Sequence, residues 1–402
     1  MRRISQLNKE EFLIGMALFS LPVSIKLNSI VTIIVAAYFL YKLIRDKFFK
    51  HLVSYYVSIA FFLAQFISYI ISEDHQKAGV KLVLYSTFLL FPLMFSYLSF
   101  KRVKLNEGKV FKYLLYGIVV IMVYGVTCFL YDIIFLDERY DYGRAVALLL
   151  KYIPHHAYMS MLILISIYAT IIGRLENNGN KRAIYILPFL YLFLILLSSR
   201  MAILVGVVIL PLFLFVKIRK KGYAKKFIWT GLLALVALIA IGFTNDFVRD
   251  KILYSYYEIM DIATNDTPFF GVSFRQKVWG TAYTLITESP LWGYGIGDIQ
   301  EILNASYSEK EVVGLNAHNQ YFQLALHHGV IIFSILMILL IKTIRRCFGN
   351  KRNLILFSWT VLLFFCLTES ILNRQWGVVL FAFILNYSTY TNTLALKEPE
   401  KI

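Results

Sequence analysis

The sequence predicts an all-α protein that crosses a membrane many times. Of its 402 residues, 59% are hydrophobic and 16% are charged, whereas soluble globular domains carry about 25% charged residues. Long apolar runs recur along the chain and end on clusters of Lys and Arg. Because many runs approach the roughly 20 residues that a helix needs to cross a bilayer, they indicate transmembrane helices rather than buried helices of a soluble core.

We expect about twelve transmembrane helices, several of them short. The first run follows a basic start but has no clear small-residue cleavage site, so we interpret it as a retained helix rather than a signal peptide. The chain is expected to divide into helices 1–9 over residues 1–243, a catalytic loop over residues 244–328, and helices 10–12 with a tail over residues 329–402. The predicted spans are residues 11–26, 28–44, 52–71, 80–99, 111–131, 156–173, 183–198, 201–216, 227–243, 329–342, 354–369 and 376–393.

The net charge of +17 follows from membrane topology. With the N-terminus inside, 28 of the 41 Lys and Arg fall in the predicted inner segments, and most of the 24 Asp and Glu fall in the outer ones. This is the positive-inside bias, and it predicts that both termini are cytoplasmic. The basic character therefore requires no nucleic-acid partner.

Neither a disulfide framework nor a metal site is indicated. Cys128, Cys347 and Cys366 lie within or beside membrane or cytoplasmic segments, so no thiolate site is implied on the outer face. The triplet EDH at residues 73–75 could attract a divalent ion, but three adjacent residues on a short loop cannot all face one ion. We therefore expect no metal and no other cofactor.

Two predicted outer connections are long, covering residues 132–155 and 244–328. The second is too rich in aromatic residues to be disordered, and long loops are usually functional. Within it, DFVRDKILYSYYEIMDIA predicts a helix along the membrane surface, and FRQKVWGTAYTLITE a helix that ends at Ser289-Pro290. Next, GYGIGD offers glycines that permit close backbone approach to a ligand. Finally, LNAHNQYFQLALHHG begins a helix that leads into the tenth span.

The outer face of a membrane offers no nucleotide sugar, so a substrate for bond formation arrives activated on a lipid carrier. A sugar on a polyprenyl pyrophosphate is such a substrate, and its leaving group departs once cations neutralise its charge. The acceptor hydroxyl needs a base, for which His is suited near neutral pH. Arg200, Arg275 and His318 match these requirements. Because transfer needs near contact, we expect His318 within about 15 Å of at least one of these arginines.

Each candidate has a plainer alternative. Arg200 lies in LLSSRMAIL at the junction of two apolar runs, where a charge is costly unless it is paired or wet; the alternative is an arginine that reaches lipid headgroups. Arg275 precedes Trp279 by one helical turn and suits bidentate recognition of phosphate; the alternative is a solvated loop residue. His318 lies between Asn316 and Asn319 and could instead be a structural histidine.

Weaker candidates surround these three residues. In the first long connection, PHHAYMS begins the sixth span with two histidines. We interpret His327 and His328, at the rim of the tenth span, as interfacial polar residues, and the tyrosines of the loop as an aromatic belt. Further candidates for substrate binding are Arg144, His156, Trp279, Gly295 and Asn319.

Three motifs together resemble the O-antigen ligase and Wzy-type polymerase superfamily of bacterial envelope glycosyltransferases. They are SSRMAILVG, FRQKVW followed by SPLWGYGIGD, and AHNQYFQLALHHG, and the resemblance covers roughly residues 190–345. It implies that Arg200 and Arg275 hold the pyrophosphate of an undecaprenyl pyrophosphate-linked glycan, while His318 deprotonates the acceptor hydroxyl. The implied enzyme is an inverting, metal-independent O-antigen ligase of lipopolysaccharide biosynthesis, which acts on lipid A-core at the periplasmic face of the bacterial inner membrane.

Several alternatives remain open. Wzy-type repeat-unit polymerases share the donor and differ in the acceptor, and we favour a ligase. Protein O-oligosaccharyltransferases often carry an extra C-terminal domain, whereas this chain ends at Ile402. A transporter of lipid-linked solutes would place charges near the bilayer midplane, but here the polar candidates cluster in outer loops. A metal-dependent enzyme that uses polyprenyl monophosphate sugars would lose activity on chelation.

Overall fold

A computed structural model of the chain describes residues 9–47, 49–135, 151–175, 185–197, 199–219, 272–307, 314–349 and 352–395. Every regular element in these ranges is helical, as the sequence predicts. Seven continuous helical stretches of the described residues are long and apolar enough to cross a membrane, and some of them join two of the helices named below. Two further apolar helices are shorter. The protein is therefore a polytopic helical membrane protein, while the total of about twelve spans stays a prediction.

The described helices follow the predicted spans closely. The predicted span 227–243 and the predicted surface helix at residues 246–263 lie outside the described residues. In the N-terminal half the helices are α1 (Lys9–Val23), α2 (Ile25–Arg45), α3 (Tyr56–Ile71), α4 (His75–Leu84), α5 (Thr87–Lys101), α6 (Glu107–Phe135) and α8 (His156–Leu175). They continue with α9 (Leu187–Leu197), α10 (Arg200–Leu204), α11 (Leu210–Arg219), α14 (Val272–Glu288), α15 (Gly295–Ser306), α16 (Gln320–Gly349), α17 (Asn353–Cys366) and α18 (Gln375–Ala395).

Apolar side chains line the outside of several helices as well as the core. On α2, Ile30 and Ile34 are 56% and 61% exposed, and the exposed stripe continues one and two turns later. The second half of α16 exposes Ile331, Ile335 and Ile338 at the same helical spacing. Such stripes would be a liability in water, but they suit contact with lipid tails.

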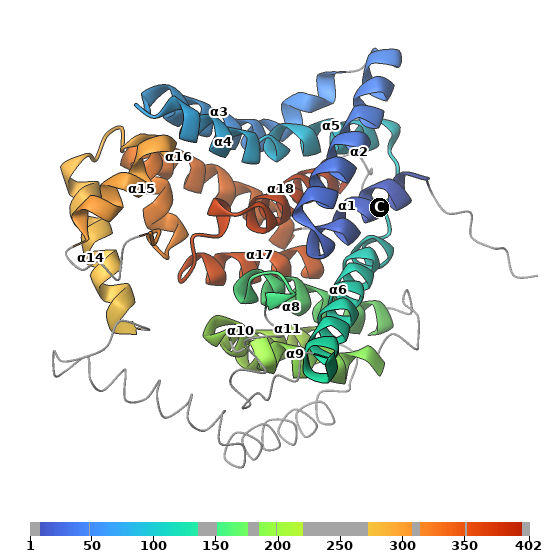
Figure 1. Cartoon of the computed structure of the whole chain (residues 1–402). Coiled ribbons are helices and arrows are strands. Elements are labelled where there is room, and N and C mark those ends of the chain that lie inside the picture. Colours follow the sequence, from blue (N-terminus) through green and yellow to red (C-terminus); the bar gives the residue numbers. More distant parts are fainter. Residues whose placement is uncertain are drawn as a thin grey trace, which may run out of the picture.

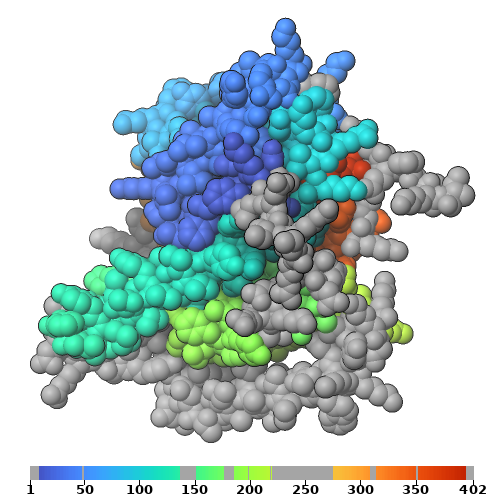
Figure 2. All heavy atoms as spheres, turned by 90° about the vertical axis from the view of Figure 1, so that its right-hand side faces the viewer, coloured from blue at the N-terminus to red at the C-terminus, as the bar shows by residue number. Residues whose placement is uncertain are grey.

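Small residues let the N-terminal helices pack closely. A Cβ atom on Gly15 of α1 would lie 2.2 Å from the ring of Tyr113, and one on Gly117 of α6 would lie 2.1 Å from the carbonyl oxygen of Phe19. Close backbone approach at small residues is typical of helices that associate within membranes. Figure 2 shows the resulting face, with α1 and α2 in blue next to α6 in teal.

A second, smaller unit occupies the opposite side of the molecule. There α14, α15 and the start of α16 pack together, to the left of α17 and α18 in Figure 1. Their own apolar core includes Val278, Ala282, Ile299, Ala317 and Leu326. Ala317 belongs to this core and directly precedes His318, the candidate base.

The α16 helix breaks at Gly329, where φ is 74° and ψ is 169°. The turn between α14 and α15 fits against this break, because Val330 N donates to Pro290 O at 2.7 Å and Tyr294 N donates to Leu326 O at 2.8 Å. A break in a membrane helix is tolerated only when its backbone groups find other partners. The unit formed by α14, α15 and the start of α16 is thus joined to the rest of α16 by backbone hydrogen bonds.

Candidate active site

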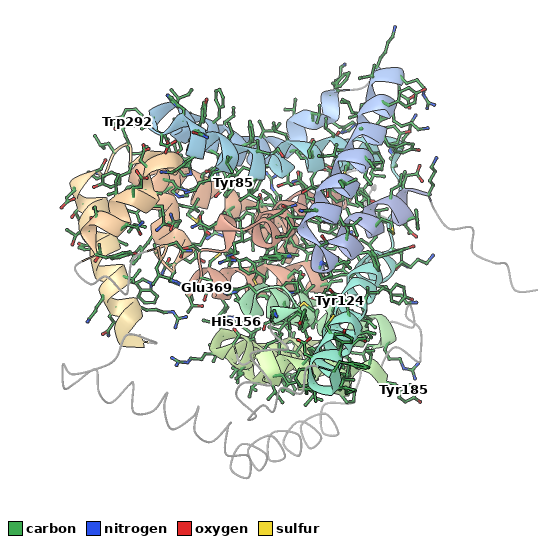
Figure 3. All side chains as sticks on the ribbon, viewed as in Figure 1. Tyr85, Tyr124, His156, Tyr185, Trp292 and Glu369 are labelled. Atoms are coloured by element: carbon green, nitrogen blue, oxygen red, sulfur yellow. The ribbon has the colours of Figure 1, made fainter. Side chains whose placement is uncertain are left out.

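A carboxylate in the connection between α17 and α18 lies at the centre of the site. The side chain of Glu369 is 15% exposed. Its Oε2 lies 3.4 Å from Nδ1 of His318, and its Oε1 lies 3.7 Å from Nη2 of Arg275. Three segments that are distant in the sequence therefore meet at one acid. Figure 3 shows Glu369 between α14 on one side and His156, at the start of α8, on the other.

His318 is held in a backbone conformation that residues other than glycine rarely adopt. Its φ is 43°, in the left-handed region, which persists only where the surroundings fix it. Here Oδ1 of Asn316 accepts a hydrogen bond from His318 N at 2.9 Å, and Nε1 of Trp279 donates to the His318 carbonyl at 3.4 Å. The strained turn directs the imidazole towards Glu369.

Asn319 joins the His318 turn to the segment that carries Glu369. Its Oδ1 accepts hydrogen bonds from the backbone of Tyr321 at 2.9 Å and Phe322 at 3.2 Å, which is the usual role of an asparagine before a helix. Its Nδ2 donates to the Leu367 carbonyl at 3.2 Å. The structure thus gives Asn319 a positioning role, and direct substrate contact stays a prediction.

Arg275 and Trp279 lie one turn apart on α14, as the sequence predicts. The Trp279 ring meets that of Phe322 edge-on, with centroids 6.3 Å apart. The neighbouring Val278 is fully buried in the outer core. This packing fixes the rotation of α14 about its axis and so places the Arg275 guanidinium, 27% exposed, next to Glu369.

Neighbouring basic side chains keep Glu369 ionised despite its burial. Burial alone would raise the pKa of this carboxyl, but the adjacent His318 and the charge of Arg275 outweigh that effect, so the pKa of Glu369 is lowered. A carboxylate surrounded by three basic side chains is a suitable partner for a histidine that gains a proton during a reaction.

Two histidines border the cluster on the side of α8. The rings of His155 and His156 stack with centroids 4.3 Å apart. Burial and the adjacent His156 lower the pKa of His155 to about 4, against the opposing effect of Glu369; Arg374 and His318 lower it further. His155 is therefore neutral near pH 7. The predicted candidate His156 thus stacks on His155, and the charge of Glu369 affects the pKa of His155.

Arg200 lies at the junction between α9 and α10. It begins α10 directly after Ser199, whose side chain accepts a hydrogen bond from Ala202 N at 3.4 Å. A Cβ atom on Gly206 would lie 3.3 Å from Leu194 of α9, so the chain reverses direction around Arg200, as the sequence predicts. The α10 helix also packs against α8. Arg200 and Arg275 therefore lie on different helices, and their action on one substrate stays a prediction.

Gly295 lies where α15 contacts α3, rather than at Glu369. A Cβ atom on Gly295 would lie 2.4 Å from Ser72 Oγ, so this glycine allows close approach of α15 to the end of α3. Nearby, the Asp298 carboxylate accepts hydrogen bonds from Glu73 N and Asp74 N at 2.7 and 2.8 Å. A ligand role for Gly295 stays a prediction. Arg144 lies outside the described residues.

The sequence reasoning missed Glu369. It placed a membrane span over residues 354–369, whereas α17 ends at Cys366 and leaves Glu369 in the connection to α18. The available signal was an acidic residue between two apolar runs on the predicted outer face, the same rule that singled out Arg200. The interpretation of His327 and His328 as interfacial residues is wrong, because they are 0% and 1% exposed in the described structure.

Comparison with known families agrees with the predicted resemblance. Residues 183–337 match the family model described as O-Antigen ligase, which confirms the resemblance to the O-antigen ligase and Wzy-type polymerase superfamily. Members of this superfamily are membrane glycosyltransferase-like enzymes, namely ligases and polymerases. The matched segment contains Arg200, Arg275 and His318, whereas Glu369 and His156 lie outside it. A search of curated proteins found no match.

Proposed function

We propose that this chain, with its O-antigen ligase segment, is an inverting, metal-independent glycosyltransferase. It would move a glycan from undecaprenyl pyrophosphate to a sugar hydroxyl of lipid A-core at the periplasmic face of the bacterial inner membrane. The observation that supports this best is the contact of His318 and Arg275 with one carboxylate, Glu369, at 3.4 and 3.7 Å. A base, its orienting acid and a cation for phosphate thus occupy one site.

His318 would act as the general base. With Nδ1 facing the ionised Glu369, the ring keeps a proton on Nδ1 and leaves Nε2 as the acceptor. The contact of 3.4 Å is long, but such hydrogen bonds often tighten only in the complex with substrate. Nε2 takes the proton of the acceptor hydroxyl, and the carboxylate stabilises the imidazolium that forms.

The same step would break the bond between the glycan and its carrier. The acceptor oxygen attacks the anomeric carbon from the side opposite the pyrophosphate, and the bond from that carbon to the leaving oxygen breaks. One displacement of this kind inverts the anomeric centre. The electron pair departs with the pyrophosphate, whose charge Arg275 and Arg200 would neutralise. Glu369 keeps Arg275 in place before the donor arrives.

The proposal is tested by reconstitution of the purified protein in liposomes with an undecaprenyl pyrophosphate-linked glycan, with and without lipid A-core. A ligase forms product only when lipid A-core is present. Glycan chains that lengthen without lipid A-core would identify a polymerase instead. Product formation should persist in EDTA, and its loss would favour the metal-dependent alternative.

Two histidine variants test the role of the base. His318→Ala should abolish product formation, because a positioned general base contributes about 10²- to 10⁴-fold. His75→Ala is the matched control, because His75 begins α4 and its ring packs against the ring of Tyr69, with centroids 5.2 Å apart. If His318→Ala keeps full activity, His318 is not the general base, and the proposed mechanism is refuted for any acceptor.

A further inference from the structure

Two glutamines at the start of α16 join the segments that carry His318 and Glu369. Oε1 of Gln323 accepts hydrogen bonds from Ala317 N at 3.1 Å and from the Ser370 hydroxyl at 3.5 Å. One turn earlier, Oε1 of Gln320 accepts from Leu372 N at 2.6 Å. Both glutamines are 1% exposed. The segment before His318 and the segment after Glu369 are therefore both hydrogen-bonded to buried side-chain amides of α16.

The orientation of the Gln323 amide determines the tautomer of His327. A backbone N–H can only donate, so the Gln323 oxygen must face Ala317 and its NH₂ group must face the other way. There it meets Nε2 of His327 at 2.9 Å. Since the NH₂ group donates, Nε2 of His327 must accept, and the ring carries its proton on Nδ1. His327 is fully buried, so no solvent competes for this contact.

The Ala317 peptide precedes the residue with the left-handed backbone. His318 keeps its φ of 43° only while the flanking groups are fixed. Ala317 is fully buried in the outer core, and its N–H donates to Gln323. Loss of that acceptor would leave a buried donor unpaired and release the strained turn.

We propose that Gln323, hydrogen-bonded to His327, is a positioning residue that holds the His318 turn against Glu369. The inference rests on the proposed role of His318 as the base. Neither Gln323 nor His327 touches substrate; they act through the Ala317 peptide. A displacement of the base by about 1 Å can cost roughly 100-fold in rate, so loss of this contact should lower kcat by about 10- to 100-fold and leave KM for the donor nearly unchanged.

A nearby pair provides the matched control. Nε2 of Gln65 on α3 lies 2.9 Å from Nε2 of His328, the residue after His327. Gln65 is also fully buried, but its contact does not involve the Ala317 peptide. Gln323→Met and Gln65→Met therefore remove the same type of buried amide–imidazole hydrogen bond, and only the first touches the His318 turn.

Two readouts separate positioning from a general loss of stability. The first is kcat and KM in the reconstituted transfer assay, with the midpoint of thermal unfolding measured in parallel. Gln323→Met should lower kcat far more than Gln65→Met at a similar loss of thermal stability. Gln323→Glu keeps an acceptor for Ala317 N and should recover part of kcat. Equal losses of kcat in the two Met variants would overturn the proposal.

The second readout does not depend on the reaction. The rate at which diethyl pyrocarbonate modifies His318 is followed by peptide mass spectrometry, with His75 as internal reference. Release of the turn should raise this rate at least threefold in Gln323→Met and leave it unchanged in Gln65→Met. An unchanged rate in both variants would overturn the positioning role, even if the protein forms no glycan product and the proposed function fails.

Discussion

Replacement of Glu369 by glutamine tests the centre of the proposed site. Glu369→Gln preserves the size of the side chain and one oxygen acceptor but removes the negative charge that faces His318 and Arg275. Since the pKa of Glu369 is lowered by these neighbours, the wild-type carboxylate is ionised throughout the neutral range. The substitution therefore removes a charge that is present under all ordinary assay conditions.

The size of the effect follows from the geometry. Two unit charges 3.4 Å apart interact by about 5 kcal/mol at an effective dielectric constant of 20. Water screens part of this interaction, because the carboxylate and the imidazole are 15% and 22% exposed. The net value of a hydrogen bond to a charged group is about 1.5–3 kcal/mol. At about 1.4 kcal/mol for each factor of ten, kcat should fall roughly 10- to 150-fold.

The assay is the reconstituted transfer reaction, measured at neutral pH. Glu301→Gln is the control, since Glu301 is 66% exposed on α15 and pairs with Lys77. A Glu369→Gln enzyme with kcat within twofold of wild type would refute the reasoning.

Three further predictions concern the same framework. Arg275→Lys should raise KM for the donor roughly tenfold, because lysine offers a point charge in place of a bidentate fork; an unchanged KM in the transfer assay would exclude phosphate contact. His155 has its pKa lowered from 6.5 to about 4, so between these pH values the unfolded chain binds more protons, and stability is complete above pH 6.5 and falls as the pH drops towards 4. Thermal unfolding midpoints that stay constant from pH 7.5 to pH 5 would contradict this. The lowered pKa of Glu369 acts in the same direction only at lower pH, because its contribution is lost as the pH falls below the ordinary value of 4.5. Gly329→Ala should destabilise by about 2–3 kcal/mol, because its Cβ would lie 2.1 Å from Leu291 O at a positive φ, whereas Gly280→Ala, which meets nothing within 4 Å, should gain about 0.5–1 kcal/mol in the same thermal melts.

The sequence alone determined the helical elements and their setting. Hydrophobic composition, the length of the apolar runs and their repetition indicated membrane helices, because the need to satisfy every backbone group in lipid leaves few alternatives. Local signals also located α14, which ends before Ser289-Pro290, and the helix that follows His318. Arg275, Trp279 and His318 were identified because their residue types and their places in the loop match the chemistry of phosphate and of a base.

Only the tertiary structure decided which of these residues meet. Glu369 joins His318 and Arg275 across segments separated by dozens of residues, and no local period encodes that contact. The burial of His327 and His328 depends on α3 packing against α16, and the break at Gly329 depends on the turn that fills it. Helical periodicity reports on neighbours three or four residues away, whereas the site arises where helix ends and connections converge. The sequence thus specified the helices and the chemistry available, and the packing of distant connections determined the site.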